Sequence, residues 1–229
     1  MAESSPTTPT PISIDVVSDV MCPWCYIGKR RLEAALDKLD DVEVSVRWRP
    51  FQLDPTLPPE GRDRREYLET KFGGPENAKA IYARVEDAGR DEGLDFKFGD
   101  IEVSPNTLDA HRLIRWAANE GEGVQDRLVE LLFRRFFMEG GHIGRHEELI
   151  STAEEAGMDR AIVETLLATD KDKKEVSEEI AVAQRMGVTG VPCFIIENKY
   201  AVMGAQEADH IAQAVRQAAE MKEVGAPAS

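Results

Sequence analysis

The 229-residue chain is poor in cysteine, in basic charge and in long apolar runs, and each shortage excludes a class of protein. Three cysteines are too few for a scaffold held together by disulfides. The 28 Lys and Arg residues are outnumbered by 43 Asp and Glu residues, and the net charge of −15 argues against a nucleic-acid-binding face. No stretch approaches the roughly 20 continuous apolar residues that cross a membrane. We therefore expect an acidic globular protein without nucleic-acid or membrane partners.

The two ends of the chain have little potential for regular structure. Residues 1–11 are rich in Ser, Thr and Pro and have neither the basic nor the apolar segment of a signal peptide. We expect a disordered N-terminal lead-in at 1–11, a flexible tail at 223–229 and a cytoplasmic location. In that compartment a pair of neighbouring thiols is expected to cycle between redox states rather than to hold the fold together.

Two of the three cysteines lie three positions apart, in the stretch Cys22–Cys25 with the sequence CPWC. An apolar run at 12–17 predicts a strand before it, and apolar positions at helical spacing from Ile27 to Leu39 predict a helix after it. The first thiol therefore falls at a helix N-terminus, where the helix dipole and free N–H groups stabilise a thiolate. The second thiol lies one turn further on, close enough to form a small disulfide with the first.

The same spacing could instead be half of a zinc site, since C-x-x-C begins many metal-binding knuckles. A complete site would need a second such pair, and the sequence has none. The four histidines, at His111, His142, His146 and His210, all lie far along the chain from this cysteine pair. We therefore assign Cys22 as the nucleophile and Cys25 as the resolving thiol, and we expect no metal and no tightly bound cofactor.

Three neighbours of the cysteines could contribute to the site, and two of them have alternative interpretations. Pro23 fits the first helical turn, where its missing N–H has no partner to lose. Trp24 is expected either to offer an exposed apolar surface to a substrate or to pack under the rest of the protein. Asp19 could relay protons during thiol exchange, but we favour its capping the start of the helix.

The pattern of elements predicts an α/β protein of thioredoxin-like fold with a large all-helical insertion. A strand is expected at 42–48, an antiparallel hairpin at 193–196 and 200–203, and a last helix at 207–222. Seven helical patterns occupy the middle of the chain, at 64–71, 75–92, 107–119, 124–138, 146–156, 160–168 and 171–186. We expect a thioredoxin-like domain formed by 12–61 and 187–222, with the helical insertion domain at 62–186 between its βαβ half and its C-terminal ββα half.

A second motif, Gly187–Pro192, lies between the last inserted helix and the hairpin. Its Val191–Pro192 bond, just before a strand, is a candidate cis peptide. Cys193 follows directly. Strand alternation should turn its side chain away from the side that Val191 presents, so we favour a buried core thiol over a third redox partner.

Together these motifs resemble the DsbA-family thioredoxin-fold proteins, and most closely the FrnE-like branch that is grouped with 2-hydroxychromene-2-carboxylate isomerases and kappa-class glutathione transferases. The resemblance runs from about Ile12 to Met221 and is carried by four segments, Ser18–Gly28, Ser104–Arg112, Gly187–Pro192 and Gly204–Gln206.

The resemblance implies a cis Pro192 that faces the disulfide as part of the catalytic site, with Val191 offering backbone hydrogen bonds to a bound thiol partner. It also implies that Asn106, Thr107 and His111, from the insertion, approach the cleft and bind substrate. For His111, a packed histidine inside a buried helix is an equally good interpretation.

The resemblance leaves three functions open. Family members similar to the transferases and isomerases tend to carry serine at the first active-site position, so Cys22 with Cys25 favours a thiol–disulfide oxidoreductase or isomerase. The alternative is a glutathione-dependent isomerase or transferase acting on an aromatic or polyketide-like small molecule. The third is a non-enzymatic thioredoxin-like chaperone. The expected partners are protein or small-molecule disulfides, with glutathione as a possible co-substrate or a thioredoxin system; the oligomeric state is open.

Overall fold

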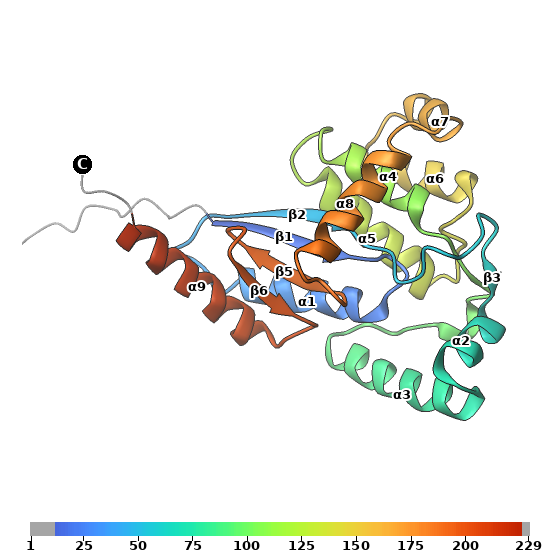
Figure 1. Cartoon of the computed structure of the whole chain (residues 1–229), viewed down its shortest axis with the longest axis horizontal. Coiled ribbons are helices and arrows are strands. Elements are labelled where there is room, and N and C mark those ends of the chain that lie inside the picture. The colour runs from blue at the N-terminus through green and yellow to red at the C-terminus, as the bar shows by residue number, and fades with distance from the viewer. Residues whose placement is uncertain (1–11, 226–229) are drawn as a thin grey trace, which may run out of the picture.

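The computed structural model describes residues 12–225 of the chain, and side chains as far as residue 222. The lead-in expected at 1–11 lies outside the described residues, as do 226–229 (Figure 1). The last helix, α9 (Ala208–Gly225), runs three residues into the segment 223–229 that the sequence predicts to be a tail. The flexible tail at 223–229 stays a prediction.

A four-stranded mixed sheet forms the centre of the molecule, in the order β2-β1-β5-β6. Its strands are β1 (Ile12–Ser18), β2 (Val44–Pro50), β5 (Cys193–Ile196) and β6 (Tyr200–Met203). β1 and β2 are parallel, whereas β5 pairs antiparallel with both β1 and β6, so the predicted hairpin is confirmed. β2 extends to Pro50, past its predicted end, because Ser18 at the end of β1 pairs with it. A proline is tolerated there, at the end of an edge strand.

The helices of the insertion match the seven predicted ranges to within two residues at each end. They are α2 (Arg64–Phe72), α3 (Pro75–Asp91), α4 (Leu108–Ala117), α5 (Val124–Phe137), α6 (His146–Ala156), α7 (Arg160–Leu167) and α8 (Lys173–Arg185). The insertion also contains two short strands that the sequence analysis missed, β3 (Arg62–Asp63) and β4 (Val103–Ser104), which pair antiparallel. A short 3₁₀ turn, η1 (Phe98–Asp100), precedes β4. The insertion is therefore helical apart from this small ladder.

The faces of the sheet are covered by different helices. α1 (Pro23–Leu36) and α9 pack against each other and share an apolar core with Val16 of β1. The next residue, Val17, points the other way and packs with Ala183 of α8. This alternation is the period-two pattern of a strand that is buried on both faces.

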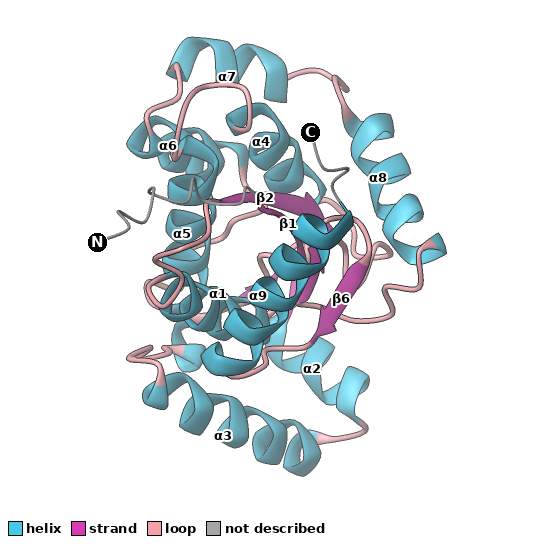
Figure 2. Cartoon of the chain, turned by 90° about the vertical axis from the view of Figure 1, so that its left-hand side faces the viewer, coloured by secondary structure: helices cyan, strands magenta, loops and turns pink. Residues whose placement is uncertain are grey.

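The insertion lies around one end of the sheet. Figure 2 shows α6 and α7 on one side of it and the α2–α3 hairpin on the opposite side. One apolar core runs from α1 and the sheet into α5 and α6, so the division into two domains stays a prediction. Within residues 12–225, no helix is both long and apolar enough to cross a membrane.

Candidate active site

The pair of thiols lies at the junction of β1 and α1, as the sequence predicts. A tight turn leads into the helix, in which the Cys22 N–H donates to the Asp19 carbonyl oxygen at 2.9 Å. Cys22 is the N-cap residue, with φ −94° and ψ 114°, and Pro23 occupies the first turn. Because no side chain caps this helix end, its free N–H groups are left to the thiol region, where they favour a negative charge.

The two thiols differ in environment. The Cys25 side chain is enclosed, and burial raises its pKa well above the ordinary value, with the neighbouring Cys22 adding to the rise. The neighbouring Ser18 side chain and Asp19 backbone oppose this shift without cancelling it. Cys25 is therefore held as a neutral thiol in the folded protein. Trp24, between the two cysteines, is 38% exposed, which agrees with the surface-exposed alternative.

The Val191–Pro192 peptide bond is cis, as the resemblance implies. Its loop faces the first thiol, because the Cys22 Sγ donates a long hydrogen bond of 3.8 Å to the carbonyl oxygen of Val191. The Pro192 carbonyl oxygen accepts from the N–H of Gly204 at 2.8 Å, which ties the loop to the end of β6.

Gly28 allows the proline loop to lie against α1. A Cβ at this position would come within 2.8 Å of the Pro192 Cγ and 3.4 Å of the Phe194 ring. The absence of a side chain therefore sets how closely the proline approaches the helix that carries both cysteines. Gly28 belongs to the motif that carries the resemblance, but the sequence alone assigns it no role.

Asp19 is fully buried and does not cap α1, so the favoured capping interpretation is wrong. Its Oδ2 accepts from the N–H of Leu53 at 2.7 Å, and its Oδ1 lies 3.4 Å from the N–H of Met21. The carboxylate thus joins the turn before Cys22 to the segment after β2. A capping prediction fails here because the turn makes Cys22 the N-cap.

Of the three insertion residues, His111 contacts Asp19 at this junction. It lies on α4, is 2% exposed, and its Nε2 is 3.4 Å from the Asp19 Oδ1. The ring also lines a cavity of about 530 Å³ along the outer edge of β2, beside Trp48 and Pro50. His111 is therefore both packed and adjacent to the turn that leads to Cys22.

Asn106 and Thr107 are engaged in structural contacts. The Asn106 amide donates to the Leu57 carbonyl oxygen at 2.6 Å and accepts from Gln52 at 3.2 Å and from the Leu108 N–H at 2.9 Å. Thr107 is 1% exposed and is the residue before α4. Their substrate-binding roles stay predictions.

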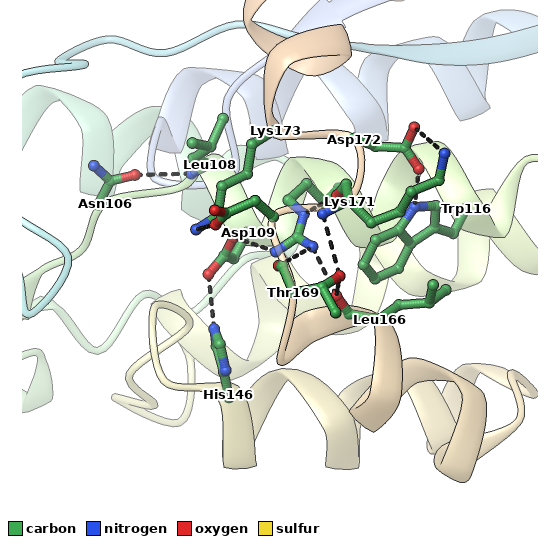
Figure 3. A network of polar contacts seen from close by, with 12 residues as sticks. Asn106, Leu108, Asp109, Trp116, His146, Leu166, Thr169, Lys171, Asp172 and Lys173 are labelled. Atoms are coloured by element: carbon green, nitrogen blue, oxygen red, sulfur yellow. Dashed lines mark hydrogen bonds and ion pairs between the residues drawn. The ribbon is translucent and has the colours of Figure 1, made fainter.

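The orientation of α4 is fixed on its opposite side by Arg112, which is fully buried. Its Nε donates to the Lys171 carbonyl oxygen at 2.6 Å, and its Nη2 donates to those of Leu166 and Thr169, both at 2.8 Å. Figure 3 shows this network, which continues through Asp109 to His146 at 2.7 Å. The arginine anchors α4 to the loop before α8 and so holds the adjacent His111 in place.

Cys193 lies apart from the other thiols. It is completely buried on the other face of the sheet, in a cluster with Val17, Phe51 and Val188, and burial raises its pKa. This placement agrees with the core-thiol interpretation. Among residues 12–222, no group of three or more His, Cys, Asp and Glu side chains could hold a metal ion.

The chain matches known proteins along most of its length. Residues 13–216 match the family model described as the DSBA-like thioredoxin domain. An uncharacterised protein of Bacillus subtilis, YwbO, is 29% identical over 192 residues, which cover 81% of this chain and 86% of that protein.

Two solved structures illustrate the range of similar folds. A probable DsbA oxidoreductase from Streptomyces coelicolor is 32% identical, with a TM-score of 0.82 over 95% of this chain and 93% of its own. A 2-hydroxychromene-2-carboxylate isomerase shares the fold at 16% identity, with a TM-score of 0.68 over 93% of this chain and 100% of its own. The resemblance seen in the sequence is thus confirmed: the chain belongs to the DSBA-like thioredoxin domain family.

Proposed function

We propose that the protein is a thiol–disulfide oxidoreductase or isomerase that works through a mixed disulfide on Cys22. The observation that carries this proposal is the contrast between the two thiols. Cys25 is enclosed and its pKa is raised by burial, whereas Cys22, at 5% exposure, is the N-cap residue of α1 beside the Val191 carbonyl. A thiolate, not a thiol, attacks a disulfide, so this contrast favours Cys22 as the nucleophile.

The reaction has two steps. The Cys22 thiolate attacks one sulfur of the substrate disulfide, forms a mixed disulfide and releases the other substrate sulfur as a thiolate. Cys25 then loses its proton and attacks the Cys22 sulfur, which releases the second substrate thiolate and leaves a Cys22–Cys25 disulfide. The substrate gains two electrons and two protons, and an external dithiol restores the enzyme. Running the steps backwards oxidises a substrate dithiol.

The surroundings of the thiols support substrate binding at this point. Trp24 is exposed beside the pair and gives an apolar surface for a polypeptide or a small disulfide. The Val191 backbone, which lies beside the Cys22 sulfur, would hydrogen-bond an extended partner, as in β-strand addition. We place the reaction in the cytoplasm and propose glutathione or a thioredoxin system as the electron partner.

The test is reduction of insulin by the protein with dithiothreitol as the reductant. Cys22→Ser is expected to abolish catalysis, and Cys25→Ser to accumulate mixed disulfides with substrate. Cys193→Ala is the matched control, since it removes a thiol from the far face of the sheet and is expected to leave turnover unchanged. Full activity of Cys22→Ser would refute the proposal. Activity that survives Cys25→Ser and requires glutathione would instead indicate the glutathione-dependent isomerase or transferase.

A further inference from the structure

A cavity of about 340 Å³ lies within the insertion, between α2, α3 and the turn η1. Its wall is mostly apolar and is formed by Leu68, Pro75, Ala78, Tyr82, Phe98 and Ile101. Cavities of this size and character are typical of small-molecule sites, in which a few polar groups fix the orientation of an apolar ligand. This cavity is distinct from the one that His111 lines beside β2.

Arg64, which also lines this cavity, is a buried cation without an anionic partner. Its side chain is 4% exposed, its Nη2 donates to the Tyr82 hydroxyl at 2.9 Å, and its Nη1 lies 3.5 Å from the Ser104 hydroxyl. Its guanidinium also lies 5.2 Å from the Phe136 ring centre. Among the described residues no carboxylate lies in ion-pair range of it, and its Nε has no hydrogen-bond partner.

This arrangement is unfavourable for the protein alone. An arginine that is taken out of water is normally compensated by a carboxylate, because neutral partners recover only part of the lost hydration. Burial accordingly lowers the pKa of Arg64. Arg64 is moreover the first residue of α2, where the positive end of the helix dipole disfavours another positive charge.

The rim of the cavity adds to the positive charge. Arg65 and Lys79 line the cavity as well, and Glu69 is its one acidic lining residue. The Glu69 carboxylate is already bonded to the Arg65 Nε at 2.8 Å. In a chain with a net charge of −15, this is a local site with excess positive charge.

We propose that the cavity binds a small organic carboxylate with an apolar body, whose carboxylate pairs with Arg64. The guanidinium is suited to such a group because its planar donors match the two oxygens of a carboxylate. The apolar wall would contact the apolar body of the ligand. A bare inorganic anion has no such body and would make few contacts with this wall.

Tyr82 joins the cation to the apolar wall. This tyrosine bonds Arg64 and lines the cavity. The binding itself does not depend on the proposed redox reaction.

The test is calorimetric titration of the full chain with 1-naphthoate, and in parallel with the uncharged 1-naphthamide and with acetate. We expect 1-naphthoate to bind roughly 10- to 100-fold more tightly than either of the others, because a hydrogen-bonded charge pair and the apolar contact are both needed. Equal binding of naphthoate and naphthamide by the unmodified protein would refute the role of the charge. Failure of naphthoate to bind at millimolar concentration would overturn the site.

Arg64→Met is the matching variant, since it keeps the length and apolar stem of the side chain. It is expected to lose the preference for naphthoate over naphthamide while still binding naphthamide. Arg90→Met removes the same charge from the exposed side of α3, outside the cavity, and should keep the preference. Loss of the preference in both variants would show that net charge alone attracts the ligand and would overturn the pairing with Arg64.

Discussion

Asp19 and His111 meet in the interior of the molecule, where the Oδ1 of the aspartate and the Nε2 of the histidine are 3.4 Å apart and both side chains are buried. The aspartate comes from the turn before Cys22, and the histidine comes from α4, the third helix of the insertion. Their contact joins the helical insertion to the start of the active-site motif. It also places a buried carboxylate within three residues of the reactive thiol.

Asp19→Asn is expected to slow the resolving step about 100-fold, the usual size of a general-base contribution. Cys25 must lose its proton in an enclosed site, and Asp19 carries a buried carboxylate in the turn that leads to Cys22. Asparagine keeps the oxygen that accepts from Leu53, so the fold should persist. Rapid quenching and mass spectrometry would follow the mixed disulfide, which should accumulate.

The matched control is Asp15→Asn, because Asp15 lies on β1, before the turn that holds Asp19, and is paired with Arg49. It should leave the rate of resolution unchanged. An unchanged rate in Asp19→Asn would mean that Asp19 only joins the turn to the Leu53 segment.

Gly28→Ala is expected to destabilise the protein by about 1–3 kcal/mol and to lower turnover, because its Cβ would overlap the Pro192 ring. Moving that ring displaces the Val191 carbonyl from the Cys22 sulfur. Urea unfolding and insulin reduction would measure the two effects. Gly190→Ala is the control in the same loop, since nothing lies within 4 Å of a Cβ built there. Equal behaviour of the two variants would contradict the packing argument.

The elements of this fold could be predicted from local patterns, and the site only in part. Apolar periodicity finds the hairpin and the inserted helices because each pattern is complete within one element. The cysteine pair and the proline loop can also be recognised within short stretches of the sequence. The contacts of Asp19 with His111 and of Gly28 with Pro192 are not, because each depends on how closely two distant segments pack.

The two missed strands and Arg64 show the same limit. β3 and β4 have two residues each, which is too few to show an alternating pattern of apolar and polar side chains. In the sequence Arg64 is one of several charged residues at a helix start, where solvent exposure is the usual expectation. Only the packing of α3 and η1 against α2 encloses it, and only then does the missing counter-charge become visible.

Arg112→Met is expected to lower the free energy of unfolding by about 3–5 kcal/mol and the melting temperature by about 10 °C. The substitution removes the guanidinium donors from three carbonyl oxygens and from the Asp109 carboxylate. Differential scanning calorimetry measures the shift. Arg160→Met, which breaks an exposed pair with Glu154, should leave the melting temperature unchanged. A similarly small shift for Arg112→Met would mean that the loop before α8 is held by its other contacts.

The stability of the reduced protein is expected to fall with rising pH from about pH 8.5, where thiols of an unfolded chain lose their protons. Burial raises the pKa of both Cys25 and Cys193, so the folded state keeps protons that the unfolded state releases. The stabilisation is fully present below about pH 8.5 and is lost as the pH rises through the folded-state values. Each thiol contributes at most about 1.4 kcal/mol per pH unit to the slope of the free energy of unfolding against pH.

Urea unfolding under reducing conditions between about pH 7 and 9 would measure this slope, below the pH of about 10 at which tyrosines of an unfolded chain lose their protons. Cys25→Ala and Cys193→Ala should each remove part of it, because each eliminates one enclosed thiol. Only the first should also stop thiol turnover, since Cys193 lies on the far face of the sheet. A flat profile in the unmodified protein would contradict the burial of the two thiols. Loss of turnover in Cys193→Ala, with its stability retained, would instead assign this third thiol a part in the redox reaction.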